Sequence, residues 1–359
     1  MERGLSLSQL AHKLAEQERE KHDFIAPTKL AAMSTDATQV AILENVGTTE
    51  EEYGNPYEVG ELAHDQIAAR LQIPTKFYRR MRQDHPEILA GTVNHLWQHE
   101  PAEAMFRTLG GRVRAVLSDR YNRIENGDIA RVVLPVLMDK ANELRPIACE
   151  VTEKRLYMQF VSERVKGDVK VGDAVQAGVT ISNSETGHGA VSVRAMVWRL
   201  WCKNGAIAPD GNFRAHHVGR RIGADEDLND IFADDTRRAD DTAIMLKVRD
   251  HVKAALDEVQ FGKRLDKLRA LTEGPKLADP VAAVKVLSKK LEFSDAEGTD
   301  ILRQLIEGAD ITPYGVMNAV TFQAHATPSF DRAIEFEAAG GKLLEFSRAD
   351  WKEITEAKQ

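Results

Sequence analysis

The chain mixes segments with a two-residue hydrophobic period and segments with a helical period, and the clearest two-residue alternation lies in residues 178–207. A short apolar run at 179–182 predicts one strand, and residues 191–198 predict a second strand that is apolar on one face. The apolar positions of that face are Val191, Val193, Ala195 and Val197. Residues 183–189 between the strands are rich in types that favour turns. We therefore predict a β-hairpin with a long loop at the centre of the fold.

The preceding part of the chain predicts more strands and several helices. Gly110-Gly111 marks the turn of a second hairpin over 104–118, and 145–165 predicts another strand pair. A strand is expected at 39–43, and helical spacing predicts helices over 5–22, 61–71, 76–82, 84–98 and 129–142. The pair at 61–71 and 76–82 resembles a helix-turn-helix, which reads duplex DNA, but two packed helices give the same pattern.

The C-terminal third predicts helices only. Apolar residues recur at helical intervals over 242–272, so we expect one long helix there. Three shorter helices have recognisable starts at Asp279-Pro280, at Ser294 with Glu297, and at Thr312-Pro313. A last helix is expected over 329–338, ending at Gly340-Gly341, followed by a short charged tail at 350–359.

Together these patterns predict an α+β fold with an antiparallel, hairpin-rich sheet core, flanking helices and a helical C-terminal region. We divide the chain into a partly irregular N-terminal arm (1–57), an α+β core domain (58–222), an acidic connector (223–241) and a helical C-terminal region (242–359).

Composition places the protein among soluble globular chains. Of its 359 residues 43% are hydrophobic and 29% are charged, and no apolar run approaches the roughly 20 residues that span a bilayer. The charged N-terminus lacks the apolar segment of a secretory signal. Cys149 and Cys202 are the only cysteines, which fits a reducing compartment. We expect a cytoplasmic protein, in the host cytoplasm if a phage encodes it, with no membrane contact.

The charge is unevenly spread, although the net charge is −8. Residues 223–241 hold 8 acidic and 2 basic residues. Residues 145–221 hold 12 basic against 7 acidic residues, and residues 70–125 hold 10 against 6. An acidic protein with a locally basic surface can still attract a polyanion, because the local field steers the encounter. The alternative is that these basic residues only solvate strand and helix surfaces.

Enzyme motifs are missing from the sequence. It contains neither the phosphate loop of nucleotide hydrolases nor the HExxH motif of zinc proteases. Glu185 with His188, or Asp119 with Asp128, would bind a divalent ion only if the fold brought more ligands to them. We therefore expect no catalytic residue and no metal or cofactor, and keep a metal-dependent nuclease as a third hypothesis.

Two groups of residues combine cations with aromatic rings, as in proteins that hold single strands through phosphates and stacked bases. The first group is Arg194, Trp198, Arg199, Trp201 and Lys203, and the second is Arg112, Arg114, Arg120, Tyr121 and Arg123. We predict that these ten residues bind nucleic acid. The alternative for Trp198 and Trp201 is a place in the core, where aromatic residues are common.

Several of these segments resemble one known family. The segments are 62–81, 107–126, 178–205 and 314–321 (YGVMNAVT), with Gly340-Gly341-Lys342-Leu343-Leu344. They are similar, in the same order over about 53–344, to the phage/plasmid-like family catalogued as domain of unknown function nine hundred and thirty-two. The resemblance implies a role in phage or mobile-element replication, recombination or counter-defence, and it assigns no catalytic residues. By analogy, the predicted fold is similar to phage single-strand annealing proteins.

The leading hypothesis is thus a phage- or prophage-type protein that binds single-stranded DNA as a homo-oligomer and promotes annealing in recombination. The second is a protein-binding accessory or counter-defence factor without enzymatic activity, in which the acidic residues 223–241 imitate nucleic acid.

Overall fold

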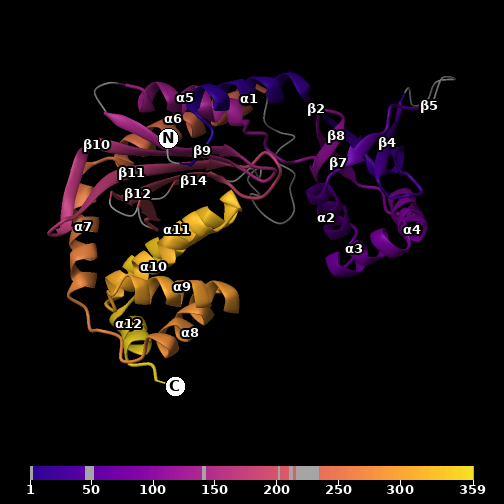
Figure 1. Ribbon diagram of the computed structural model, residues 1–359. Coiled ribbons are helices and arrows are strands. Elements are labelled where there is room, and N and C mark those ends of the chain that lie inside the picture. The colour runs from indigo at the N-terminus through magenta and orange to yellow at the C-terminus, as the bar shows by residue number, and fades with distance from the viewer. Residues whose placement is uncertain are drawn as a thin grey trace.

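The computed structural model describes residues 3–44, 52–139, 143–200, 203–209, 213–215 and 234–358. Over these residues the protein has two mixed sheets, sheet A and sheet B, each surrounded by its own helices (Figure 1). This confirms the predicted α+β class. None of the described helices is long and apolar enough to cross a membrane.

Sheet A contains the central hairpin of the chain. Its strand order is β1 (Arg3–Gly4), β9 (Leu144–Val151), β10 (Leu156–Lys170), β11 (Asp173–Asn183), β12 (Val191–Arg199) and β13 (Asn204–Ile207), with β14 (Phe213–Ala215) also paired to β12. Among the described strands of this sheet, only β1 and β9 pair in parallel. The hairpin predicted at 178–207 is therefore confirmed as β11 and β12. Strand β10 continues to Lys170, beyond the 145–165 predicted for the preceding strand pair.

Sheet B takes most of its strands from the first 60 residues. Its order is β2 (Lys21–Pro27), β7 (Glu103–Leu109), β8 (Arg112–Ser118), β6 (Tyr57–Val59), β4 (Gln39–Glu44) and β3 (Ala31–Met33), with β5 (Glu52–Tyr53) paired to β4. The hairpin predicted around Gly110-Gly111 is β7 and β8, and both glycines have positive φ angles of 56° and 77°. Much of the predicted partly irregular arm (1–57) thus forms strands of this sheet, from β2 to β6, whereas β1 belongs to sheet A.

Helices cover the sheets through three main clusters of apolar side chains. Helices α1 (Leu7–Glu20), α5 (Asn126–Leu137) and α6 (Asp234–Ala255) pack on sheet A, and α2 (Glu61–Arg70), α3 (Thr75–Asp84) and α4 (Pro86–His99) pack on sheet B. The third cluster joins the bent end of the β10–β11 hairpin to α7 (Glu258–Thr272) and the later helices.

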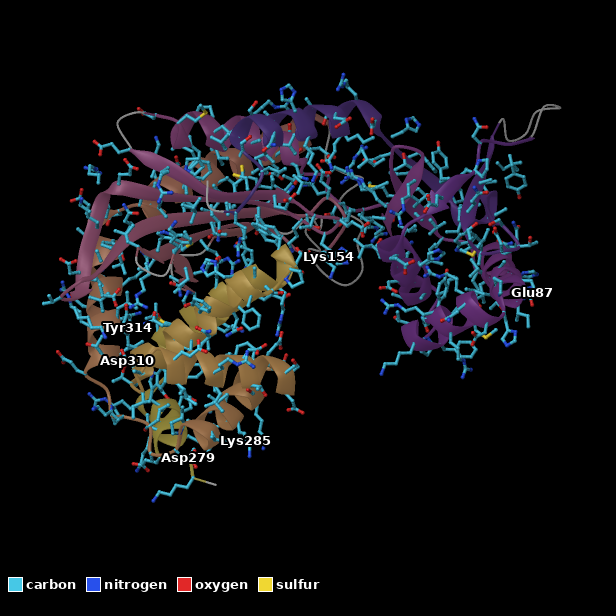
Figure 2. The ribbon with its side chains drawn as sticks, in the orientation of Figure 1. Glu87, Lys154, Asp279, Lys285, Asp310 and Tyr314 are labelled. Carbon is cyan, nitrogen blue, oxygen red and sulfur yellow. The ribbon has the colours of Figure 1, made fainter. Side chains whose placement is uncertain are left out.

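The C-terminal helices form a bundle beside sheet A (Figure 1). They are α8 (Pro280–Leu291), α9 (Asp295–Glu307), α10 (Pro313–Ala326), α11 (Phe330–Lys342) and α12 (Arg348–Thr355). The predicted caps are confirmed: Asp279, Ser294 and Thr312 each accept a hydrogen bond from a backbone N–H of the helix that follows. Asp279 lies in the bundle near its outer end (Figure 2).

Three helix predictions in this region need correction. The segment 242–272 is not one helix, because α6 ends at Ala255 and Asp257 caps the new helix α7. The tail is not only charged, because α12 buries Trp351 and Ile354. Helix α11 continues through Gly340 and Gly341, which lie where α11 approaches β13 and α10 most closely. Most of the acidic connector, residues 223–233, lies outside the described residues.

Candidate functional site

The loop between β11 and β12 lies in the junction between the two sheets. We call residues 183–188 the junction loop. Its first four residues, Asn183, Ser184, Glu185 and Thr186, are polar and yet no more than 6% exposed. Buried polar groups need hydrogen-bond partners, so the position of this loop depends on what surrounds it.

Sheet B and its helices supply one set of partners. Gln66 of α2 donates to the Thr186 carbonyl at 2.8 Å and accepts from the backbone N–H of Val116 in β8 at 2.8 Å. The Tyr121 hydroxyl donates to the Ser184 carbonyl at 2.8 Å. The loop that begins in sheet A is thereby fixed against sheet B.

The turn between β9 and β10 supplies the second set. The Ser184 hydroxyl donates to the Lys154 carbonyl at 2.7 Å, and the Thr186 hydroxyl donates to the Glu153 carbonyl at 3.1 Å. Arg155 donates to the carbonyl of His188. The turn and the junction loop are therefore joined by hydrogen bonds into one unit, which presents the side chains of 153–155 at the junction.

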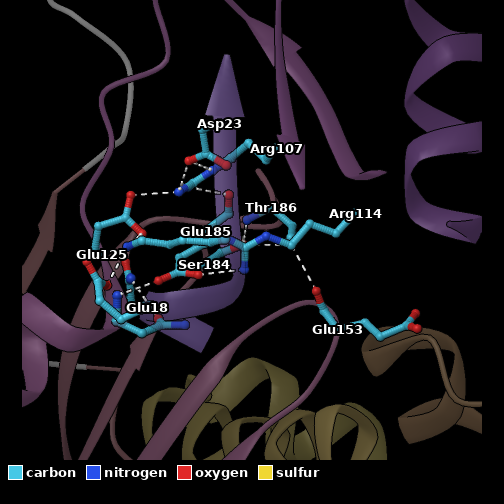
Figure 3. A network of polar contacts seen from close by, with 12 residues as sticks. Glu18, Asp23, Arg107, Arg114, Glu125, Glu153, Ser184, Glu185 and Thr186 are labelled. Atoms are coloured by element: carbon cyan, nitrogen blue, oxygen red, sulfur yellow. Dashed lines mark hydrogen bonds and ion pairs between the residues drawn. The ribbon is translucent and has the colours of Figure 1, made fainter. Parts of the chain in front are cut away.

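Beneath this unit lies a buried network of charged groups (Figure 3). Arg107 is 0% exposed and donates to Asp23 at 2.9 Å, to Glu125 at 2.6 Å and to the Glu185 carbonyl at 2.8 Å. Arg114 donates to the Glu185 carboxylate at 2.7 Å. A buried charge needs such pairing to offset its desolvation, so the network holds the two sheets in a defined arrangement.

Two carboxyl groups of the network, those of Glu125 and Glu185, have pKa values shifted in opposite directions. Burial alone would raise the pKa of Glu125, but Arg107, a hydrogen bond with Glu185 and Lys21 outweigh it and hold the pKa at about 2. Burial and repulsion from Glu125 raise the pKa of Glu185 above its ordinary value, against the opposing effect of Arg114. Glu185 is therefore the member of the pair that holds a proton more readily.

The contacts of Glu185 also test the hypothesis that this residue binds a divalent metal ion. Glu185 accepts hydrogen bonds from Arg114 and from the backbone N–H of Asn126 at 2.7 Å, so both of its oxygens are engaged. Within the described ranges, no three His, Cys, Asp or Glu side chains gather in a way that could hold a metal ion.

A cleft of about 280 Å³ opens beside the junction loop. It is bordered by α1, the start of α2, strand β8 and the β9–β10 turn. Five of its lining residues are basic: Lys13, Arg112, Arg114, Lys154 and Arg155. Three are acidic: Glu61, Glu153 and Glu185. The cleft is therefore a basic site within an acidic protein.

Several N–H groups in the cleft have no acceptor among the described residues. The Nε of Arg112 and the Nε and Nη2 of Arg114 are buried without a hydrogen-bond partner. The nearest carboxylates to Arg112 belong to Glu58 and Glu153, each 3.6 Å away, beyond the range of a strong charge-assisted bond. These donors suit a negatively charged oxygen of a ligand.

The first predicted group of nucleic-acid residues is not gathered on one open surface. Trp198 is 4% exposed, because the alternate positions of β12 place it with Met196 in the core under α11. Arg199 forms a two-point ion pair with Asp173 at 2.6 and 2.7 Å and lies over the Tyr314 ring. Lys203 is exposed, and Trp201 lies outside the described residues. The expectation that Trp198 stacks a base is therefore corrected.

The second group divides between the cleft and the surface. Arg112 and Arg114 line the cleft, whereas Arg120 and Arg123 are exposed outside it. Tyr121 is half-buried, and its hydroxyl is bound to the junction loop. The nine of these residues that the structure describes thus do not form the single aromatic and cationic channel that the sequence suggested.

Three of the five basic cleft residues were missed by the sequence reasoning: Lys13, Lys154 and Arg155. Lys13 lies in α1 and donates to the Val151 carbonyl at 2.8 Å, a contact between residues 138 positions apart. No local pattern encodes such a contact. The strand pair predicted over 145–165 implies a turn between its two strands, which is the one signal that pointed to this part of the chain.

The predicted helix-turn-helix pair is α2 and α3, and its basic face is partly neutralised. Arg79 of α3 binds Asp65 of α2 at 2.5 Å, and Arg82 binds Glu61 at 2.6 Å. These pairs lie at the surface, where each stabilises little, but they reduce the charge available to a duplex.

Comparison with known proteins gives one match. The model of a family described as Domain of unknown function (DUF932) matches residues 113–328, a shorter span than the 53–344 expected from the sequence. The matched residues include the junction loop, the β9–β10 turn and Arg114, but neither Lys13 nor Arg112. No curated protein and no solved structure matches the chain.

Proposed function

Since the chain belongs to the DUF932 family, whose description assigns no activity, we propose a function from the cleft itself: it binds the phosphate backbone of single-stranded DNA. The observation that carries this proposal is the convergence of Lys13, Arg112, Arg114, Lys154 and Arg155 on one cleft. Proteins that hold single strands place such cations along the phosphates.

The size of the cleft favours one strand over two. A volume of about 280 Å³ lies just below the usual range of small-ligand sites, so it admits a sugar-phosphate unit but not a duplex. In the described residues no exposed aromatic ring lines the cleft, so the proposal rests on phosphate contacts rather than on base stacking.

A homo-oligomer, annealing activity and a phage-type role in the host cytoplasm remain parts of the proposal. One such cleft contacts only a short piece of a strand, so a longer strand would be held by several copies side by side. Light scattering on a size-exclusion column, with and without oligonucleotide, tests this step. A monomer under both conditions would contradict it.

The binding test is fluorescence anisotropy with a labelled single-stranded oligonucleotide at low and moderate salt. Lys154 lies exposed at the β9–β10 turn, and Lys285 lies exposed on α8, in the distant C-terminal bundle (Figure 2). We expect Lys154→Glu to weaken binding about tenfold and to reduce the salt slope by about 0.7 per lost phosphate contact.

Lys285→Glu is the matched control, because it makes the same charge change far from the cleft, and it is expected to retain wild-type affinity. Equal weakening by both variants would mean that net charge, not the cleft, governs binding. Absence of binding by the wild type at micromolar protein would overturn the proposed function.

A further inference from the structure

The face of sheet A that lies against α11 carries two rows of polar residues. Strand register aligns Gln159, Thr180 and Arg194 across β10, β11 and β12. It also aligns Tyr157, Ser182 and Ser192 with Arg214 of β14. Residues directly opposite in antiparallel strands share one side of the sheet, so all of them lie on the same face.

Within these two rows, helix α11 provides hydrogen-bond partners only for the described polar side chains of β10. Its Glu337 accepts from Gln159 at 2.6 Å and from Arg3 at 3.2 Å. Its Asp331 accepts from the Tyr157 hydroxyl at 2.8 Å and from Thr152 at 3.2 Å. Both carboxylates of α11 that face the sheet therefore already have partners.

Arg194 forms no close ion pair in the described part of the chain, and the Glu337 carboxylate, which is paired with Arg3, acts on it only at longer range. Its Nε is buried and has no hydrogen-bond partner, and no carboxylate lies within ion-pair distance of its guanidinium. Burial, together with repulsion from Arg214 and Arg155, lowers the pKa of Arg194 to about 10. Tyr157 and Glu337 oppose this shift without reversing it. A buried charge without a direct ion pair is costly, and such groups are concentrated at binding sites.

Other unsatisfied groups lie on the same face. The Ser182 hydroxyl and the Oε1 of Gln159 are buried without a partner. Ser182 lies opposite Ser192, and Ser192 lies opposite Arg214. The Ser182 hydroxyl, a hydrogen-bond donor, therefore lies in the same row as the Arg214 guanidinium group. Arg155 also lines the cleft described above, which connects the two regions.

We propose that Arg155, Arg194 and Arg214 form a second binding site, for a phosphoryl dianion, on the α11-facing side of sheet A. Guanidinium groups suit this ligand, since their planar N–H pairs match two phosphoryl oxygens at once. The site goes beyond the proposed strand binding, because it takes an isolated phosphoryl group. That group is either a free phosphate or small phosphorylated molecule, or the 5′-terminal phosphate of a strand.

The test is isothermal titration of the full chain with inorganic phosphate at constant ionic strength in chloride. Wild type is expected to bind, and Arg194→Gln is expected to weaken phosphate binding at least about tenfold. Lys154→Glu, which changes the cleft, is expected to bind phosphate within about threefold of wild type. Arg214→Gln removes an exposed side chain, so it tests the same site if Arg194→Gln fails to fold.

Oligonucleotides with a 5′-phosphate and with a 5′-hydroxyl separate the two sources. Tighter binding of the 5′-phosphorylated strand, lost in Arg194→Gln, assigns the site to a strand end. Equal binding of both strands, with phosphate still bound, assigns it to a small molecule.

The proposal is overturned if millimolar phosphate does not bind and the two strands bind equally. It is also overturned if Arg194→Gln and Arg214→Gln bind phosphate like wild type. Strand binding that depends on Lys154 would survive that result.

Discussion

At the scale of single residues, buried polar side chains give this protein its most specific properties. His64 in α2 is 2% exposed, and its Nδ1 lies 3.0 Å from the hydroxyl of Tyr78 in α3. Burial, aided by Arg82, lowers the pKa of His64 from its ordinary value of 6.5 to about 4. The neutral ring therefore belongs to the folded state, and a proton on it favours unfolding.

This shift predicts a pH dependence of stability. Because the folded pKa lies below the unfolded one, the contribution of His64 is complete above pH 6.5 and is lost as pH falls toward 4. The loss approaches about 3 kcal/mol, since one pKa unit corresponds to about 1.4 kcal/mol. Urea unfolding between pH 4 and 7 measures it. The free energy of unfolding of His64→Asn is expected to fall less between pH 7 and 4 than that of the wild type. An equal fall in the variant would show that His64 does not cause this pH dependence.

At the scale of elements, close packing decides where a helix tolerates glycine. A Cβ atom at Gly341 of α11 would overlap the backbone carbonyl of Ile207, at the end of β13, and one at Gly340 would overlap the Thr321 side chain in α10. The glycines therefore allow α11 to lie directly on β13 and α10 rather than ending the helix.

Two glycine substitutions with opposite expected effects on the free energy of unfolding test this interpretation. Gly341→Ala is expected to lower the free energy of unfolding by about 1–3 kcal/mol, because backbone atoms must move to relieve the overlap. Gly262→Ala in α7 is the matched control: no described heavy atom lies within 4 Å of the added methyl group. It is expected to raise stability by about 0.5–1 kcal/mol through helix propensity. Stabilisation by both variants would show that α11 can shift freely.

At the scale of the whole molecule, one polar network joins two separately packed sheets. Asp23 and Arg107 belong to sheet B, Glu125 precedes α5, and Glu185 belongs to the junction loop of sheet A. The apolar clusters of the two sheets are separate, so the junction depends on these hydrogen bonds and ion pairs.

Removal of Arg107 is therefore expected to be strongly destabilising. Arg107→Met removes the cation that the Asp23 and Glu125 carboxylates share and leaves Lys21 as the remaining partner of Glu125, and breaking such a buried pair costs about 3–5 kcal/mol. Arg131→Gln, which removes an exposed arginine paired with Asp128 on α5, is expected to change stability by less than about 0.5 kcal/mol. Urea unfolding of both variants decides the point, and a cost below about 1 kcal/mol for Arg107→Met would contradict the role of the network.

The sequence by itself determined the local elements of this protein. The hairpins at Gly110-Gly111 and around 183–189, and the helix starts at Asp279, Ser294 and Thr312, are encoded by residues within a few positions of each other. Turn chemistry, caps and hydrophobic period act over that range, so they can be recognised without the fold.

Only the tertiary structure decided which side chains face solvent together. Trp198 and Arg199 are neighbours in the sequence, yet one is buried in the core and the other is paired with Asp173. Lys13 and Arg155 are far apart in the sequence, yet both line one cleft. The physical reason is that burial and ion pairing depend on the partners that packing brings from distant elements, and no local pattern carries that information.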